Sequence, residues 1–182
     1  MEKTINEYKN VVKECRSLFE DKLKDYGASW RILRASSVTD QIYIKINRLR
    51  TLQEINERRV DEDDKSEFIA IFNYSMIALI QLNQGFANQI DINHQEAMDL
   101  YDEFTKEAFE LMQAKNHDYG EVWRDMRISS ITDLIMQKLY RIKKIEDNAG
   151  QTIISEGLPA NFLDMANYAV FSLILLEENS NS

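Results

Sequence analysis

The chain has 182 residues, of which 44% are hydrophobic and 29% charged, as is typical of a soluble globular protein. Its formal net charge of −9 repels phosphate backbones at long range, which argues against a general DNA- or RNA-binding surface. The single cysteine excludes an intrachain disulfide and fits a reducing compartment.

Targeting signals and membrane spans are not expected. The first residues, Met1 to Asn6, form no apolar stretch, so we expect no signal peptide. The two most apolar segments, 68–82 and 162–176, are shorter than the roughly 20 residues that a bilayer-spanning helix needs. We therefore expect a cytoplasmic protein without a membrane partner.

Three helices are predicted in the first half of the chain. The first runs from about residue 5 to 24, where apolar side chains recur at spacings of three and four. Gly27 then breaks the chain into a turn. The second helix opens with a capping-box-like Ser37-x-x-Asp40, and the third begins near Asp64.

The second half repeats this order. A first helix is predicted from about residue 93 to 117, and Gly120 follows it as a turn. A second helix opens with Ser130-x-x-Asp133. The third begins at Pro159, a residue favoured at the first helical position.

An internal repeat relates the two halves. Asp118 aligns with Asp25 at an offset of 93 residues (118 − 25), and a one-residue slip follows before the third helix. Identical pairs are Asp25/Asp118, Tyr26/Tyr119, Gly27/Gly120, Trp30/Trp123, Arg31/Arg124, Arg34/Arg127, Ser36/Ser129, Ser37/Ser130, Thr39/Thr132, Asp40/Asp133, Ile42/Ile135, Lys45/Lys138, Arg48/Arg141, Phe68/Phe162, Asn73/Asn167 and Tyr74/Tyr168. The sequence thus predicts an all-α protein of two tandem three-helix repeats, 1–86 and 93–182, packed about a pseudo-twofold axis as one compact unit.

Both copies keep the same cations, although a core does not require them. These are Arg31, Arg34, Lys45 and Arg48 in the first copy, and Arg124, Arg127, Lys138 and Arg141 in the second. Guanidinium groups paired with a lysine suit phosphate oxygens, so we predict a phosphate-binding pocket. In the alternative, these arginines pair with Asp25, Asp118, Asp40 and Asp133 and brace the turn.

Aromatic and amide side chains are candidates for base recognition. Tyr119, Trp123, Asn167 and Tyr168 are the predicted set in the second copy. In the alternative, the tyrosine and tryptophan attach the Asp-Tyr-Gly turn to the core, and the asparagines fix helix register across the pseudo-twofold.

Acidic residues distinguish the copies. Glu107 and Glu110 share one helix face, and Asp164 lies in an apolar segment where an ionised carboxylate requires a partner. If these three converged, they would bind Mg²⁺, the one cofactor predicted. In the alternative, the glutamates are solvated and Asp164 forms a salt bridge with a repeated arginine.

Two segments carry a resemblance to a known family. Lys115-Asn116-His117-Asp118-Tyr119-Gly120-x-x-Trp123 and Asp164-Met165-Ala166-Asn167-Tyr168-Ala169 resemble the nucleotide modification associated domain family. The resemblance covers nearly the whole chain as two copies and implies an activity on nucleotides or modified bases.

A second resemblance is more distant. The acidic motifs on helices are similar to those of the MazG and dimeric dUTPase class of all-α nucleoside triphosphate pyrophosphatases, in which carboxylates hold Mg²⁺. Glu107 and Glu110 match the first motif and Asp164 the end of the second, but Asn161 replaces its glutamate.

Three hypotheses for function follow. The leading one is a nucleotide-binding protein of the pyrophosphatase type, acting on a nucleotide or another phosphorylated small molecule, with no residue assigned as the catalytic base. Its rival is a non-catalytic module that binds a nucleotide or a protein through the same cations. In the third, the repeated polar residues are purely structural. A homo-oligomer is compatible with each of them.

Overall fold

The computed structural model describes residues 1–55 and 63–181. In chain order the elements are α1 (Glu2–Tyr26), the 3-10 helix η1 (Ser29–Ile32), α2 (Ala35–Ile55), α3 (Asp64–Gln84), α4 (His94–Tyr119), the 3-10 helix η2 (Val122–Asp125), α5 (Ile128–Asp147) and α6 (Leu158–Ser180). The described residues contain no strand, so the predicted all-α fold of two three-helix copies is confirmed.

Two helices, α3 and α4, start with side-chain caps, and α6 has a proline in its first turn. Asp63 accepts a hydrogen bond from the Ser66 amide at 2.7 Å and caps α3. Asn93 and Glu96 form a capping box at α4. Pro159 lies in the first turn of α6, as predicted.

The predicted capping boxes of the second helices are wrong. Both helices begin three residues earlier than a serine cap would require, so Ser37 and Ser130 lie inside the first turn. Their amides already donate to the carbonyls of Arg34 and Arg127, at 2.9 and 3.0 Å. A serine side chain is therefore not needed as a cap.

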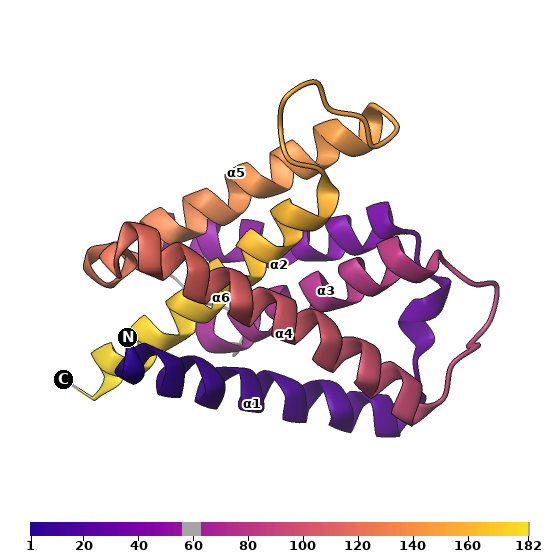
Figure 1. The fold of residues 1–182 in the computed structure, drawn as a ribbon, viewed down its shortest axis with the longest axis horizontal. Coiled ribbons are helices and arrows are strands. Elements are labelled where there is room, and N and C mark those ends of the chain that lie inside the picture. The colour runs from indigo at the N-terminus through magenta and orange to yellow at the C-terminus, as the bar shows by residue number, and fades with distance from the viewer. Residues whose placement is uncertain (56–62, 182) are drawn as a thin grey trace.

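The helices form three layers (Figure 1). The most extensive helix contact joins α3 to α6, the third helix of each copy, and these two form the middle layer. α2 and α5 pack on one side of this pair, while α1 and α4 pack on the other. The chain termini lie close together, and Lys3 Nζ is 2.7 Å from Glu178 Oε1.

Equivalent contacts between α2 and α5 follow the pseudo-twofold axis. Gln53 Nε2 donates to Thr132 Oγ1 at 3.0 Å, and Thr39 Oγ1 donates to Glu146 Oε2 at 3.2 Å. These bonds are counterparts because Gln53 aligns with Glu146 and Thr39 with Thr132. The two copies thus meet through matching residues, as a twofold arrangement requires.

Buried tyrosines and asparagines link the copies in the same symmetric way. Tyr8 Oη donates to Asn167 Oδ1, and Tyr101 Oη donates to Asn73 Oδ1, both at 2.7 Å. Each asparagine also donates from Nδ2 to a backbone carbonyl of the first helix in its own copy, at 3.0 Å. Both asparagines therefore hydrogen-bond across the pseudo-twofold, as the alternative interpretation expects.

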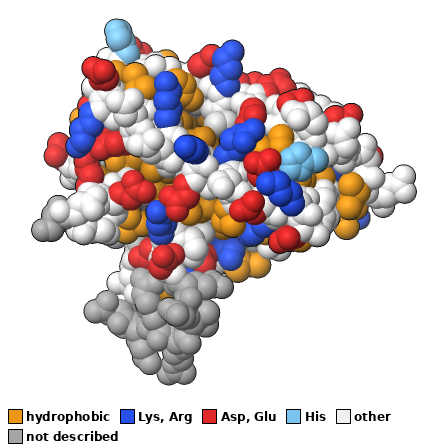
Figure 2. All heavy atoms as spheres, turned by 90° about the horizontal axis from the view of Figure 1, so that it is seen from below, with side chains coloured by type: hydrophobic (Ala, Val, Ile, Leu, Met, Phe, Trp, Pro, Cys, Tyr) orange, Lys and Arg blue, Asp and Glu red, His pale blue; other side chains and the backbone are white. Residues whose placement is uncertain are grey.

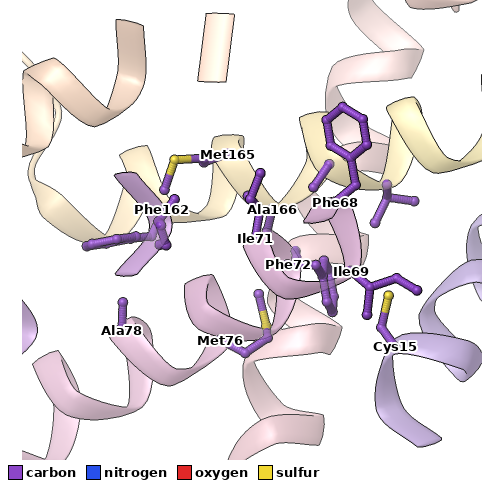
Figure 3. Close-up of a cluster of buried hydrophobic side chains, with 14 of the residues drawn as sticks. Cys15, Phe68, Ile69, Ile71, Phe72, Met76, Ala78, Phe162, Met165 and Ala166 are labelled. Carbon is purple, nitrogen blue, oxygen red and sulfur yellow. The ribbon is translucent and has the colours of Figure 1, made fainter. Parts of the chain in front are cut away.

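The core is centred on the α3–α6 contact. Figure 3 shows Phe68 and Ile71 of α3 in one cluster with Met165 and Ala166 of α6, and Cys15 of α1 at its edge. α6 is long and apolar enough to cross a membrane, which the shorter predicted segment did not indicate. However, 72% of its most apolar window is buried inside the protein, so its apolar side chains form the core.

The face beneath α1 carries charges of both signs. Figure 2 shows lysine and arginine side chains interspersed with aspartate and glutamate across this surface. Arg16, for example, lies 2.7 Å from Asp102 and 3.8 Å from Glu20. Such pairs prevent a uniform field of one sign on the visible face.

Candidate functional site

A glycine turn ends the first helix of each copy. Gly27 and Gly120 have φ angles of 67° and 72°. Their amides donate to the Leu23 and Asn116 carbonyls at 2.8 and 3.0 Å. Glycine adopts this left-handed conformation without a Cβ penalty, so the predicted helix-ending turn is confirmed. In the same turn Asp25 and Asp118 are exposed.

The first arginine after the turn in copy one is structural. Arg31 is buried and donates to Asp91 Oδ1 at 2.8 Å and to the Gly85 carbonyl at 2.7 Å. It therefore holds η1 against the segment between α3 and α4. This corrects the prediction of a phosphate ligand and also the alternative, because its carboxylate partner lies outside the turn.

Arg124 in copy two has the same role with different partners. Its guanidinium is paired with Glu7 and with Glu178, the latter at 3.0 Å, and donates to Thr4 Oγ1 at 2.6 Å. It also lies 4.5 Å from the centroid of the Trp123 ring. Two carboxylates already pair with this cation, and its predicted phosphate contact stays a prediction.

Two of the predicted base-binding side chains already contact other residues of the protein. Trp123 is buried and stacks on Phe171, with ring centroids 4.3 Å apart and an interplanar angle of 5°. Asn167 is saturated by Tyr8 and by the Ala108 carbonyl. Trp123 therefore attaches the turn to the core, and neither side chain is available to a base.

The remaining predicted residues of the turn region are accessible. Tyr119 is 74% exposed. Tyr168 is half-buried, and its pKa is raised by burial and by the charge of Asp164. Arg34 and Arg127 are exposed just before α2 and α5. For these four the predicted contacts with a ligand stay predictions.

The predicted magnesium site is not assembled. Glu107 and Glu110 are exposed on α4, whereas both oxygens of Asp164 are engaged by lysines. In the described part of the chain, no three histidine, cysteine, aspartate or glutamate residues are grouped to hold a metal ion. The donor set therefore does not fit Mg²⁺, and the glutamates form the solvated face of the alternative interpretation.

In copy one, the carboxylate that pairs with the repeated cations of α2 belongs to a buried glutamate. Glu67 is 1% exposed and lies 3.0 Å from Arg48 Nη1 and 3.7 Å from Lys45 Nζ. Lys45 and Arg48 are thus ion-paired with a buried carboxylate. This pairing was not among the interpretations of these cations, and phosphate binding by Lys45 and Arg48 stays a prediction.

The carboxylate of copy two is Asp164, three residues further along its helix. Asp164 Oδ1 lies 2.5 Å from Lys115 Nζ, and Oδ2 lies 2.7 Å from Lys138 Nζ. Partial burial opposes the charged form of Lys115, but the hydrogen bond and charge of Asp164 outweigh it and raise its pKa. The predicted salt bridge of Asp164 therefore exists, with lysines in place of the arginine.

This difference leaves Arg141 without a carboxylate partner in the described part of the chain. Arg141 aligns with Arg48, but Asn161 occupies the place of Glu67, and its amide Nδ2 donates to the Gly157 carbonyl at 2.9 Å. Among the described residues no acidic side chain pairs with Arg141 or with Lys144, its neighbour one turn away.

A cavity of about 730 Å³ lies beside these cations. It is bounded by α5, the segment from Thr152 to Glu156, and the start of α6. The lining residues with polar side chains are Lys138, Arg141, Lys144, Thr152, Ser155, Glu156 and Asn161. Lys138 is paired with Asp164, so Arg141 and Lys144 are the two lining cations that suit the cavity to an anionic ligand.

Sequence reasoning missed two cations near this cavity. Lys115 aligns with Lys22 and so belongs to the repeated set, but it was noted only as part of a motif. Lys144 aligns with Thr51, so a search for repeated residues cannot find it. Its signal was the spacing of three from Arg141, which places both on one helix face.

Comparison with known proteins gives one finding on family. The model of nucleotide modification associated domain 1 matches residues 22–82 and again residues 115–176. No curated protein and no solved structure matches the chain, so the pyrophosphatase resemblance stays a prediction. Because the two matches together span more than half of the chain, this protein belongs to the nucleotide modification associated domain 1 family and carries that domain twice.

Proposed function

We propose that this protein binds the phosphate groups of a nucleotide in the cavity between α5, the 152–156 segment and α6. The observation that carries the proposal is the pair Arg141 and Lys144, which line the cavity and have no carboxylate partner in the described residues. Membership of a family associated with nucleotide modification supports the nature of the ligand.

The chemistry of the lining favours phosphate over other anions. Arginine presents a fixed fork of donors to phosphate oxygens, and a lysine adds a mobile point charge. The hydroxyl of Ser155 supplies a further donor, whereas Thr152 Oγ1 already donates to the Ser155 carbonyl at 2.7 Å. A volume of about 730 Å³ lies within the range of small-molecule sites, roughly 300 to 1,000 Å³.

The proposal is binding rather than metal-dependent hydrolysis. A pyrophosphatase mechanism needs carboxylates gathered around Mg²⁺, whereas Glu107 and Glu110 are exposed and Asp164 is paired with Lys115 and Lys138. The non-catalytic alternative is therefore the better supported of the two.

Calorimetric titration with inorganic triphosphate and with a panel of nucleoside triphosphates tests the proposal. Asn161→Glu places the acid of copy one beside Arg141 and is expected to abolish binding of inorganic triphosphate. Arg141→Gln removes the unpaired guanidinium and is expected to weaken binding about tenfold, the effect of one charge-assisted contact. Lys106→Gln is the control, because it removes one cation from an exposed α4 position.

The outcomes separate the hypotheses. If inorganic triphosphate bound Asn161→Glu as tightly as the parent, the phosphate would bind elsewhere and the proposed site would be refuted. Release of pyrophosphate in the presence of Mg²⁺, lost in Asp164→Asn, would restore the pyrophosphatase hypothesis. If Arg141→Gln and Lys106→Gln weakened binding equally, the loss would come from the change in net charge and not from a contact in the cavity.

A further inference from the structure

Copy one contains a second cavity of different chemistry, with a volume of about 350 Å³. It lies between the C-terminal half of α1, the η1 turn and the middle of α3. Its lining includes the rings of Phe19, Tyr26, Trp30 and Tyr74, together with Lys22 and Ala70. Phosphate binding in copy two uses none of these residues.

The cavity arises from the absence of a carboxylate. Ala70 occupies the place of Asp164, and Lys22 occupies the place of Lys115. In copy two the carboxylate and its lysine meet at this position, 2.5 Å apart. In copy one the acid is Glu67, one helical turn earlier on α3, so the equivalent position is lined by a methyl group.

The lining favours a neutral, planar molecule. Tyr26, Trp30 and Tyr74 supply aromatic surface, and stacking on such rings contributes about 1 to 3 kcal/mol for each base in proteins that bind single strands. Among the described residues that line the cavity, Lys22 is the one charged residue, and none is acidic. A cation is therefore not favoured, and a polyanion would find only a single positive charge.

The cavity is open to solvent through its aromatic edge. Tyr26 is 53% exposed and Ile32 is 54% exposed, so both are accessible to an entering ligand. Tyr74 is half-buried, and burial raises its pKa, so its phenol stays neutral and able to donate a hydrogen bond at neutral pH.

We infer that copy one binds an uncharged planar aromatic molecule of nucleobase or nucleoside size between Tyr26, Trp30 and Tyr74. The two copies then bind different chemical groups, an aromatic ring in the first and phosphate in the second. This inference does not depend on the phosphate site, because its ligands need carry no phosphate.

The chain offers a selective fluorescent probe of this cavity. It has two tryptophans, and Trp30 lines the cavity whereas Trp123 is stacked on Phe171. In the full-length Trp123→Phe protein, Trp30 is the sole indole. Titration with adenosine, guanosine, cytidine and thymidine is expected to give saturable quenching by at least one of them, whereas ribose gives none. The Trp30→Phe protein is the control and is expected to show no such change.

Two variants in the Trp123→Phe background locate the ligand. Ala70→Asp introduces the side chain that copy two has at this position and is expected to weaken nucleoside binding at least tenfold. Tyr26→Ala removes an exposed ring without disturbing the core and is expected to weaken it about tenfold. Tyr140→Ala, also an exposed tyrosine but outside the cavity lining, is expected to leave binding unchanged.

The inference is overturned if no nucleoside quenches Trp30 at millimolar concentration. It is also overturned if Ala70→Asp and Tyr26→Ala both bind as tightly as the parent. Because nucleosides lack phosphate, failure here leaves the proposed phosphate site intact, and titration with inorganic triphosphate, which has no base, tests that site alone.

Discussion

The hydroxyl of Tyr8 donates a 2.7 Å hydrogen bond to Asn167 Oδ1, joining the first helix of one copy to the third helix of the other. Tyr101 and Asn73 form the counterpart bond at the same distance. Both tyrosines are almost fully buried, and burial raises their pKa values above the ordinary one, so both remain neutral donors.

Removing either phenol hydroxyl should destabilise the whole protein. Tyr8→Phe and Tyr101→Phe each leave a buried asparagine oxygen without its donor, at a cost of about 1 to 3 kcal/mol in the free energy of unfolding. The two values are expected to be similar because the sites are related by the pseudo-twofold. Urea denaturation measures them, with the exposed Tyr140→Phe as control. A loss confined to one variant would contradict the symmetry.

Neutralising the two buried carboxylates should have unequal effects. Glu67→Gln leaves Lys45 and Arg48 next to a neutral group inside the fold, and we expect a loss of about 3 kcal/mol. Asp164→Asn should cost less, about 1 to 2 kcal/mol, because the Lys115 side chain is 46% exposed and can turn into water. Chemical denaturation measures the free energy of unfolding of both variants. A larger loss in Asp164→Asn than in Glu67→Gln would contradict the prediction.

Glu146 should make stability depend on pH. Burial raises its pKa above the ordinary 4.5, and the hydrogen bond from Thr39 only partly opposes this. A folded-state pKa above the unfolded one gives a contribution that is present below about pH 4.5 and is lost as the pH rises through the folded pKa.

The residue at the equivalent position of copy one suggests the variant. Glu146→Gln introduces the glutamine found there as Gln53, and we expect it to stabilise the protein at neutral pH by no more than about 1 kcal/mol, since solvent screens a half-exposed group. The gain should vanish in acid. Thermal unfolding across this pH range tests it, and a gain that is independent of pH would exclude titration as the cause.

Cys15 should be unreactive in the folded protein. Its side chain is buried in the core, and burial raises the pKa of the thiol to about 12. At pH 8 only about one molecule in ten thousand then carries a thiolate, the reactive species. Labelling with a chromogenic disulfide should therefore be slow in buffer and complete in denaturant. Rapid labelling of the native protein would show that α1 opens readily.

The fold was predictable because its signals are local. Apolar spacing, Gly27 with its counterpart Gly120, and Pro159 are features of the adjacent sequence, and each determined a helix or its end. The starts of α2 and α5 were misplaced because Ser37 and Ser130 fit a cap pattern while the backbone had already entered the helix.

The site was less predictable because its partners are distant in the chain. Asp91, which pairs with Arg31, and Glu178, which pairs with Arg124, lie 60 and 54 residues away from their arginines. No pattern in the neighbouring sequence predicts ion pairs between residues so far apart in the chain. Comparing the two copies also directed attention to the residues that the copies share. Both cavities, however, occur at positions where the copies differ, Ala70 in the first and Asn161 in the second.

The crossed tyrosine bonds also have a consequence for a severed chain. A protease that cuts between Gly85 and Asn93 removes the covalent link between the halves but none of the bonds that Tyr8 and Tyr101 make. The two fragments would therefore remain together as a native-like heterodimer, and they would separate only under conditions that unfold both.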